Sequence, residues 1–163
     1  MNRPDLAEKK IYTRPAMVQQ VAQWREKGKR IVFTNGVFDI LHAGHIYSLS
    51  EAARQGDYLV VGLNADASVK RLKGPGRPVN TQEARALLLA SLLVVDAVVL
   101  FEEDTPLDLV KAIMPDVLVK GGDYTVEQVA GAREVIASGG RVVINPIREG
   151  YSTTAIIEKM KRG

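Results

Sequence analysis

The sequence predicts a single α/β domain of the doubly wound, Rossmann-like class, with helices on both faces of a five-stranded parallel sheet. Short runs rich in Val, Ile and Leu alternate with longer amphipathic stretches, which is the pattern of βαβ units. Each run is compact and aliphatic, as expected when both faces of the sheet are covered. The 163 residues suffice for one core, and no internal repeat or interdomain linker interrupts them.

The predicted strands share a dense aliphatic composition and comprise residues 30–34, 58–63, 97–101, 117–119 and 141–145. A helix over residues 15–27 precedes them, since Met17, Val21 and Trp24 share one face and Gly28 can end it. We therefore divide the chain into an N-terminal arm with a helix packed on the core, residues 1–29, and a main domain, residues 30–163. For residues 1–14, a disordered arm and an arm exchanged between subunits both stay open.

The remaining helices are placed by their apolar faces and capping residues. The helix after the first strand has its apolar face at Ile46, Leu49 and Ala53. Three further helix starts carry a side-chain oxygen that can accept an unpaired amide hydrogen, at Asn80, Thr105 and Thr125. The last helix follows Ser152, and its predicted buried residues are Ile156, Ile157 and Met160.

Composition narrows the classes of function. The chain has no cysteine, which excludes disulfides, thiolate metal sites and cysteine nucleophiles. Its net charge of +3 is too small to indicate nucleic-acid binding. The first ten residues lack the apolar core of a signal peptide, and no apolar run is long enough to span a membrane. We therefore expect a cytoplasmic protein that binds neither nucleic acid nor a membrane.

Both histidines of the chain lie in the segment 34–45, between the first strand and the next helix. In an open parallel sheet the ligand crevice lies beyond the carboxyl ends of the strands, where a helix N-terminus offers free amides to an anion. Gly36 allows a tight turn, and Gly44 lets the backbone approach a phosphate. His42 and His45 can then direct imidazole donors at the same oxygens. The segment predicts a site for a phosphate chain.

Other chemistries have less support. Zinc binding is disfavoured because a three-residue spacing of histidines on a loop is unusual and Asp39 is the one carboxylate nearby. The chain has neither the G-x-S-x-G of serine hydrolases nor a P-loop, G-x-x-x-x-G-K-[ST]. A basic stretch at residues 70–77, beside Gly74-Pro75-Gly76, is either a solvated mobile loop or a source of cations for an anionic substrate.

The segment His42-Ala43-Gly44-His45, after Thr-Asn-Gly-Val-Phe-Asp, resembles the HxGH signature of the nucleotidylyltransferase superfamily. Tyr151-Ser152-Thr153-Thr154 resembles its C-terminal signature. The similarity is closest to the stand-alone adenylyltransferases of bacterial heptose activation, through residues 70–74, 77–80, 101–106 and 120–124, and it covers about residues 30–160. This resemblance implies transfer of AMP from ATP to D-glycero-D-manno-heptose 1-phosphate, with release of pyrophosphate, for lipopolysaccharide core biosynthesis. It further implies Mg²⁺ and a homodimer.

By the same resemblance, the catalytic residues are His42, His45 and Lys73. The residues expected to bind the nucleotide are Thr34, Asn35, Gly36, Phe38, His42, His45, Lys120, Gly121, Asp123, Arg148, Ser152 and Thr153. Those expected at the sugar phosphate are Asp39, Asn64, Asp66, Lys73 and Arg77. The metal ligands stay unassigned, with Asp39 and Asp123 as candidates. No general base is required, because a phosphate monoester has a second pKa of about 6 and is largely dianionic at neutral pH.

Three alternatives remain open. A cytidylyltransferase that acts on a small phosphorylated alcohol, such as glycerol 3-phosphate, is one, because residues 148–154 also resemble that branch. A non-catalytic nucleotide sensor is the second, although both histidines and Lys73 are present. An aminoacyl-tRNA synthetase fragment is the third, but the chain has no strong basic face for tRNA. The apolar segment 87–95 is either core or a dimer surface.

Overall fold

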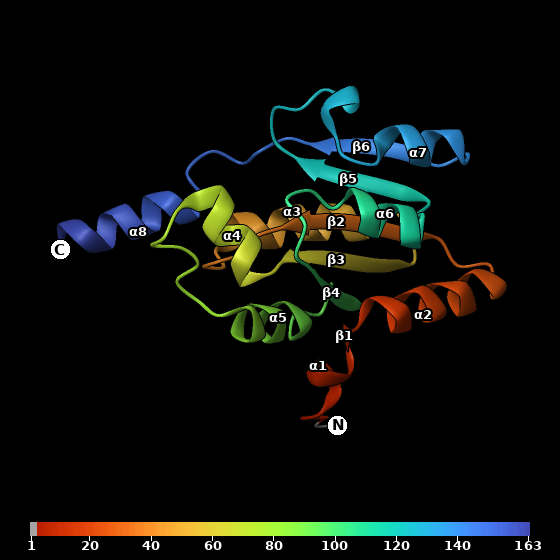
Figure 1. Cartoon of the computed structure of the whole chain (residues 1–163), viewed down its shortest axis with the longest axis horizontal. Helices are drawn as coiled ribbons and strands as arrows, with labels where there is room; N and C mark the ends of the chain where they lie inside the picture. The colour runs from red at the N-terminus through yellow and green to blue at the C-terminus, as the bar shows by residue number, and fades with distance from the viewer. Residues whose placement is uncertain (1–2) are drawn as a thin grey trace.

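The computed structural model describes residues 3–163; Met1 and Asn2, which belong to the predicted N-terminal arm, lie outside the described residues. A sheet of six parallel strands organises the chain in the order β1-β4-β3-β2-β5-β6 (Figure 1). The strands are β1 (Ile11–Tyr12), β2 (Ile31–Gly36), β3 (Tyr58–Asn64), β4 (Ala97–Phe101), β5 (Val117–Gly121) and β6 (Arg141–Asn145). Strands β2 to β6 confirm the five predicted ones.

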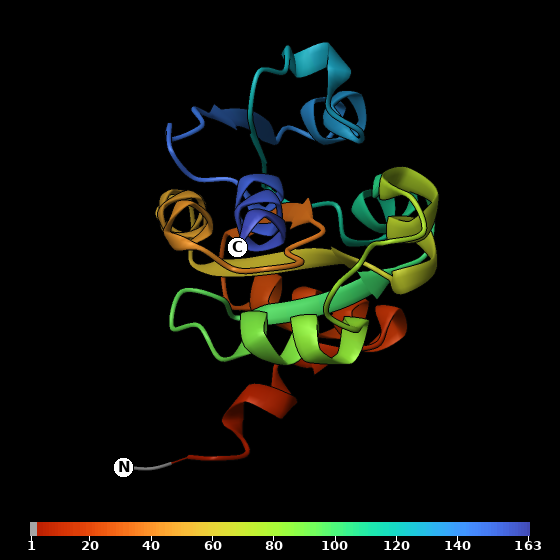
Figure 2. The same ribbon diagram turned by 90° about the vertical axis from the view of Figure 1, so that its left-hand side faces the viewer.

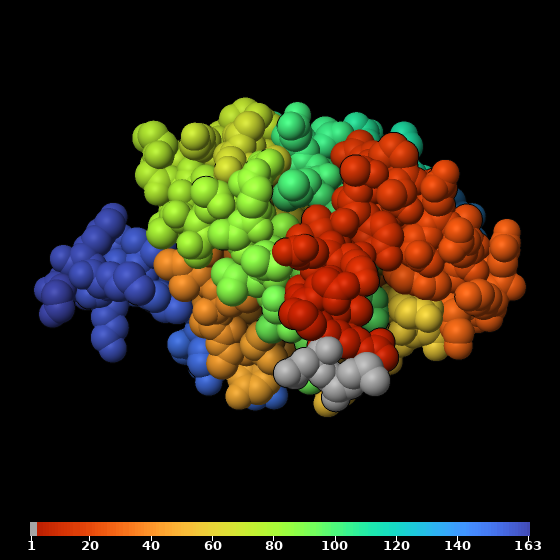
Figure 3. All heavy atoms as spheres, turned by 90° about the horizontal axis from the view of Figure 1, so that it is seen from below, coloured from red at the N-terminus to blue at the C-terminus, as the bar shows by residue number. Residues whose placement is uncertain are grey.

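The predicted number of strands is wrong by one, because β1 adds an edge strand beside β4. A strand of two residues is too short to give a periodic pattern, and its position depends on distant contacts. The Nζ of Lys10 donates to the carbonyl oxygens of Leu92 and Val95 at 3.2 and 2.8 Å. The preceding helix α1 (Leu6–Lys9) contacts α5, and Figure 3 shows this red segment against the green one. Residues 6–12 are thus packed on the edge of the sheet.

Helices cover both faces of the sheet, as predicted. One face carries α3 (Ala43–Ala53) and α5 (Gln82–Ala90), and the other carries α2 (Arg14–Glu26), α6 (Leu107–Ile113) and α7 (Ala132–Ala137). Figure 2 shows α3 to the left of the sheet and α6 and α7 to its right. The remaining elements are α4 (Asp66–Lys73), the 3₁₀ helix η1 (Val126–Gln128) and α8 (Thr153–Arg162). No helix in residues 3–163 is both long and apolar enough to cross a membrane.

The order of the strands determines where a ligand can bind. From the central β2 the chain moves outward to β3 and β4, and it then returns to place β5 and β6 on the other side. Connections therefore leave the neighbours β2 and β5 in opposite directions. In such sheets the crevice lies beyond the carboxyl ends of that strand pair. Here those ends are residues 35–36 and 120–121.

The predicted buried faces of two helices need correction. α8 begins after Ser152 as predicted, and the Ser152 hydroxyl accepts a hydrogen bond from the amide of Ala155 at 3.3 Å. It has no buried residue, however, and Met160 is 67% exposed. The helix projects from the body of the molecule (Figures 1 and 3). In α3 the buried residues are Leu49 and Ala52, whereas Ile46 is exposed. An amphipathic pattern does not show what covers the apolar face.

The predicted helix starts are correct only in part. α5 is capped by Thr81, whose hydroxyl accepts from the amide of Ala84. The side chain of Asn80 instead donates to the carbonyl oxygen of Asp39 at 2.7 Å. The other two predictions are confirmed: Thr125 forms a capping box with Gln128 at the start of η1, and at the start of α6 the amide of Leu107 donates to the hydroxyl of Thr105 at 3.4 Å. Three cations of the basic stretch, Lys70, Arg71 and Lys73, lie in the last turn of α4 and not in a loop.

Candidate active site

The two histidines flank the first turn of α3, at the carboxyl end of β2. His42 is the N-cap residue, and its backbone amide donates to Nδ1 of His45 at 3.2 Å. Nδ1 of His45 is therefore an acceptor, so in the neutral ring Nε2 carries the hydrogen. The two rings are stacked with centroids 3.9 Å apart. This arrangement leaves His45 as a directed donor from Nε2.

Burial makes both imidazoles neutral at physiological pH. Burial, with the neighbouring His42 as a second cause, lowers the pKa of His45 to about 4. Burial also lowers the pKa of His42. A neutral ring donates a hydrogen bond without the cost of a buried positive charge. The pair therefore offers neutral hydrogen-bond donors to an incoming anion. Once bound, the anion favours the protonated form of a ring.

Two clefts meet at His45. The first has a volume of about 560 Å³ and is lined by residues that include Asn35, Gly36, Phe38, Asp39, Asn64, Lys73, Arg77 and Lys120. The second has a volume of about 670 Å³ and is lined by residues that include His42, Tyr47, Gly121, Ile147, Arg148, Tyr151 and Ser152. His45 and Thr153 line both. The two clefts therefore share these two residues.

Aromatic rings dominate one wall of the second cleft. The guanidinium of Arg148 lies 4.1 Å from the ring centroid of Tyr47. Tyr47 meets Tyr151 edge to face at 5.9 Å, and Tyr151 is stacked with His42 at 6.1 Å. Sequence reasoning missed Tyr47, although its position two residues after His45 was a signal. The wall is aromatic and carries a cation at one end, which suits a nucleobase.

Asp39 holds the loop that closes the first cleft. Its carboxylate accepts from the Nε of Arg77 at 2.7 Å and from the amides of Val79 and Asn80 at 2.9 Å. Burial opposes ionisation of Asp39, but these amides and the guanidinium outweigh burial and lower its pKa. Arg77 and Asp39 therefore neutralise each other at the rim of the cleft.

Arg85 lines neither cleft but holds the loops of the site, and sequence reasoning missed it. Its side chain is fully buried and donates to Asp66 at 2.7 Å and to three backbone carbonyl oxygens, those of Val37, Asn64 and Asn80. These bonds connect the three loops around the first cleft. The signal in the sequence was an arginine four positions before the buried Leu89, on the apolar face of α5.

The structure gives some predicted site residues other partners. Thr34 is buried within β2, and Asp66 and Asp123 line neither cleft. Asn64 lines the first cleft, but its amide donates to the hydroxyl of Ser68 at 3.1 Å. The contact of Asn64 and Asp66 with a sugar phosphate stays a prediction. Their observed contacts give each a role in holding the loops.

The donor set does not fit a magnesium ion held by protein side chains alone. Within residues 3–163 no group of three or more His, Cys, Asp or Glu side chains could hold a metal ion. Of the two candidate ligands, Asp39 has both oxygens engaged with Arg77 and two amides. Asp123 is an exposed single carboxylate.

Residues 33–159 match the family described as cytidylyltransferase-like. The bifunctional protein HldE of Acidiphilium cryptum (strain JF-5) is 56% identical over 155 residues, which cover 95% of this chain and 32% of that protein. The HldE of Mesorhizobium japonicum is 59% identical over 145 residues, with 89% and 29% covered. The chain thus spans about a third of the length of the curated relatives that it matches.

Two solved structures share the fold. The lipopolysaccharide core biosynthesis protein from Thermoplasma volcanium GSS1 has 34% identity and a TM-score of 0.60, covering 77% of this chain and all of that chain. The pantoate-beta-alanine ligase of Francisella tularensis has 16% identity and a TM-score of 0.56, with 93% and 76% covered. The second likeness concerns the fold alone.

Proposed function

The chain belongs to the cytidylyltransferase-like family, and from this premise we propose that it transfers AMP from ATP to D-glycero-D-manno-heptose 1-phosphate and releases pyrophosphate. That the chain is a nucleotidyltransferase follows from the family and the relatives. The observation that carries the finer proposal is the meeting of two clefts at His45 and Thr153. Donor and acceptor can approach each other there from opposite sides.

The nucleotide occupies the second cleft. Its base packs on the wall of Tyr47 and Arg148, and its phosphates reach the N-terminus of α3. Free amides at the start of α3 and α8 and the hydroxyls of Ser152 and Thr153 bind the phosphate oxygens. ATP would enter as its magnesium complex, in which phosphate oxygens and water molecules supply ligands of the metal.

The acceptor phosphate attacks the α-phosphorus from the first cleft. Its oxygen forms the new P–O bond while the bond to the β-phosphate breaks and pyrophosphate leaves. The barrier arises mainly from repulsion between anions, so positioned donors and cations provide the catalysis. Nε2 of His45 donates to the α-phosphate, and Lys73 compensates charge from the acceptor side. The attacking oxygen is already ionised at neutral pH, so no base takes a proton.

The proposed sugar rests on two kinds of support. Residues 120–124 and 101–106 resemble those of heptose adenylyltransferases, and the 34% identical structural neighbour is named for lipopolysaccharide core biosynthesis. We place the reaction in the cytoplasm, where ATP is made and used.

We also propose a homodimer. The segment 87–95 divides in the structure: Leu89 and Val95 are buried, whereas Leu87, Leu88 and Leu93 are 43, 46 and 99% exposed. Such a group of exposed leucines is typical of an interaction surface.

Pyrophosphate release tests the function directly. We would cross ATP and CTP against heptose 1-phosphate, glycerol 3-phosphate and no acceptor. We expect release with ATP and heptose 1-phosphate, and a loss of about 100-fold or more in the variant His45→Ala, the scale of a lost transition-state donor. Release only with CTP and glycerol 3-phosphate would replace the proposal with a cytidylyltransferase. Nucleotide binding without release in any pairing would favour a sensor.

A further inference from the structure

The first cleft contains two lysines whose charges nothing in the described chain balances. Lys73 ends α4 and Lys120 lies near the end of β5, and both side chains line the cleft. Neither ammonium has a hydrogen bond or ion pair within residues 3–163. The other charged pair at this cleft, Arg77 and Asp39, is self-compensated.

The closeness of the two lysines is unfavourable without a ligand. Burial, and then the charge of Lys73, lower the pKa of Lys120. Lys120 is half-buried and Lys73 is exposed, so the half-buried ammonium is the one that gains most from a bound anion. The carboxylate of Asp104 also lines this cleft, but it is paired with Arg71. The anion that fits must therefore come from outside the chain.

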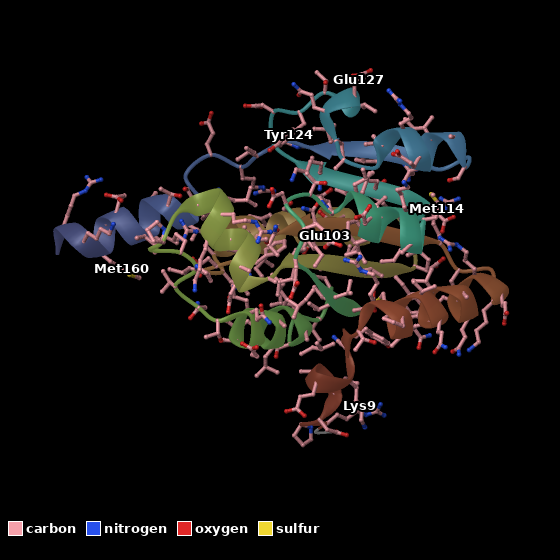
Figure 4. All side chains as sticks on the ribbon, viewed as in Figure 1. Lys9, Glu103, Met114, Tyr124, Glu127 and Met160 are labelled. Atoms are coloured by element: carbon pink, nitrogen blue, oxygen red, sulfur yellow. The ribbon has the colours of Figure 1, made fainter. Side chains whose placement is uncertain are left out.

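The aromatic ring of Tyr124 folds back over Lys120 in the same cleft. Tyr124 lies beyond the carboxyl end of β5 (Figure 4), and Lys120 Nζ is 5.1 Å from its ring centroid. The turn before Tyr124 depends on Gly122, whose φ is +117°. A Cβ at Gly122 would lie 3.2 Å from the ring. Glycine thus allows the ring to lie over the lysine, and the tyrosine remains 45% exposed.

A free amide group completes the wall. Gln128 of η1 accepts from the backbone amide of Thr125 through Oε1 at 2.9 Å, which leaves its Nε2 to donate. Tyr124 and Gln128 both line the first cleft. A cation, an aromatic face and an amide donor together suit a small molecule that carries a phosphate, apolar C–H groups and hydroxyls.

Strand geometry separates Lys120 from the nucleotide. Successive side chains on a strand point to opposite faces, and accordingly Lys120 lines the first cleft while Gly121 lines the second. We propose that Lys120, Tyr124 and Gln128 form the subsite for the sugar phosphate acceptor. Lys120 and Lys73 bind its phosphate, Tyr124 packs on the sugar ring, and Gln128 donates to a hydroxyl. This inference rests on the proposed function, names its acceptor subsite, and moves Lys120 from the nucleotide to the acceptor.

Steady-state kinetics with each substrate varied separately test the subsite. For Lys120→Met we expect the KM for heptose 1-phosphate to rise about tenfold or more, with the KM for ATP within twofold of wild type. Tyr124→Leu should raise the acceptor KM several-fold, and Tyr124→Phe should restore it because the ring is kept. Lys111→Met, an exposed lysine of α6, is the matched control and should change neither KM. A rise in the KM for ATP alone, or unchanged acceptor KM, would overturn the inference.

Direct binding separates this inference from the proposed function. We would titrate mannose 1-phosphate into protein saturated with a non-hydrolysable ATP analogue, which requires no turnover. We expect wild type to bind the sugar phosphate and Lys120→Met to bind it at least tenfold more weakly, with equal affinity for the analogue and an unchanged circular dichroism spectrum. If no acceptor is turned over but this pattern holds, the proposed reaction fails and the subsite stands. Absent binding by wild type, or weakened binding of the analogue alone, removes the subsite.

Discussion

His45 is neutral in the free protein because burial removes the water that would stabilise an imidazolium. We expect its ring to titrate near pH 4, since burial and His42 lower its pKa to about 4. Proton NMR of the two imidazoles across pH 3–8 measures this, with His45→Asn to assign the signals. A saturating ATP analogue should raise the midpoint, because a nearby anion favours the protonated ring. A midpoint near 6.5 in the free protein contradicts the burial argument.

The lowered pKa of His45 makes the stability of the folded chain depend on pH. The unfolded chain binds a proton at His45 near the reference pKa of about 6.5, whereas the folded chain binds it near pH 4. The contribution of neutral His45 to the stability of the fold is therefore complete above about pH 6.5 and is lost as the pH falls toward 4. As the pH falls through this range, the free energy of unfolding measured in urea should decrease less in His45→Asn than in wild type.

Arg85 is fully buried and its side chain donates four hydrogen bonds, which makes its loss costly. In Arg85→Met the carboxylate of Asp66 and three carbonyl oxygens lose their donor. We expect the free energy of unfolding to fall by about 3 kcal/mol or more, the scale for breaking a buried pair. Urea denaturation measures the change. The exposed pair of Arg54 and Glu51 provides the control, since Arg54→Met should cost about 1 kcal/mol or less. Equal small losses in both variants would contradict the role of Arg85.

Site residues that are neighbours in the sequence could be predicted from it, whereas those that depend on tertiary contacts could not. The histidine pair and Gly44 stand in one short segment, so their junction between strand and helix could be recognised. The contacts of Arg85 and Tyr47 reach up to 48 and 104 positions along the chain, to Val37 and Tyr151. No local pattern encodes such contacts.

The junction of β2 and α3 requires a glycine between the histidines. A Cβ at Gly44 would lie 2.6 Å from Cβ of Tyr151 and 2.9 Å from Cε1 of His42. In Gly44→Ala these side chains must move, so we expect kcat to fall about tenfold or more while the melting temperature changes little. Gly76→Ala is the control, because nothing lies within 4 Å of a Cβ there. Pyrophosphate release measures both variants, and full activity of Gly44→Ala would show that the ring stack tolerates displacement.

Helices and strands were predicted correctly where their apolar pattern was long and where they pack in the core. The strands β2 to β6 are five to seven residues long and lie between two layers of helices. β1 escaped prediction because two residues carry no period, and its pairing depends on β4 and Lys10. The apolar stripe of α8 was assigned to a core that the structure does not provide.

For the whole molecule, predicting a parallel sheet was enough to predict where the ligand crevice lies. It was not enough to predict that the crevice consists of two clefts. The prediction located ligands beyond the carboxyl ends of the strands, and both clefts lie there. Their separation depends on Lys120 and Gly121 facing opposite ways and on α8 approaching His45 through Thr153. The hydroxyl of Thr153 donates to the carbonyl oxygen of Ile40 at 2.9 Å, across 113 positions. Contacts at that distance are invisible to pattern analysis.

The proposed homodimer is a property of the whole molecule and has a sharp test. Leu93 is 99% exposed, and exposure of so large an apolar side chain is unfavourable unless a partner covers it. We expect sedimentation analysis to find a dimer for wild type and a monomer for Leu93→Lys, because a dimer would bury the ammonium without a partner. Ile136→Lys, at an exposed apolar residue of α7 on the opposite face, should remain dimeric. A wild-type monomer, or a dimer that survives Leu93→Lys, would show that this surface does not join two copies. Pyrophosphate release from the monomeric variant then decides whether each chain holds a complete site, as the two clefts within one chain lead us to expect.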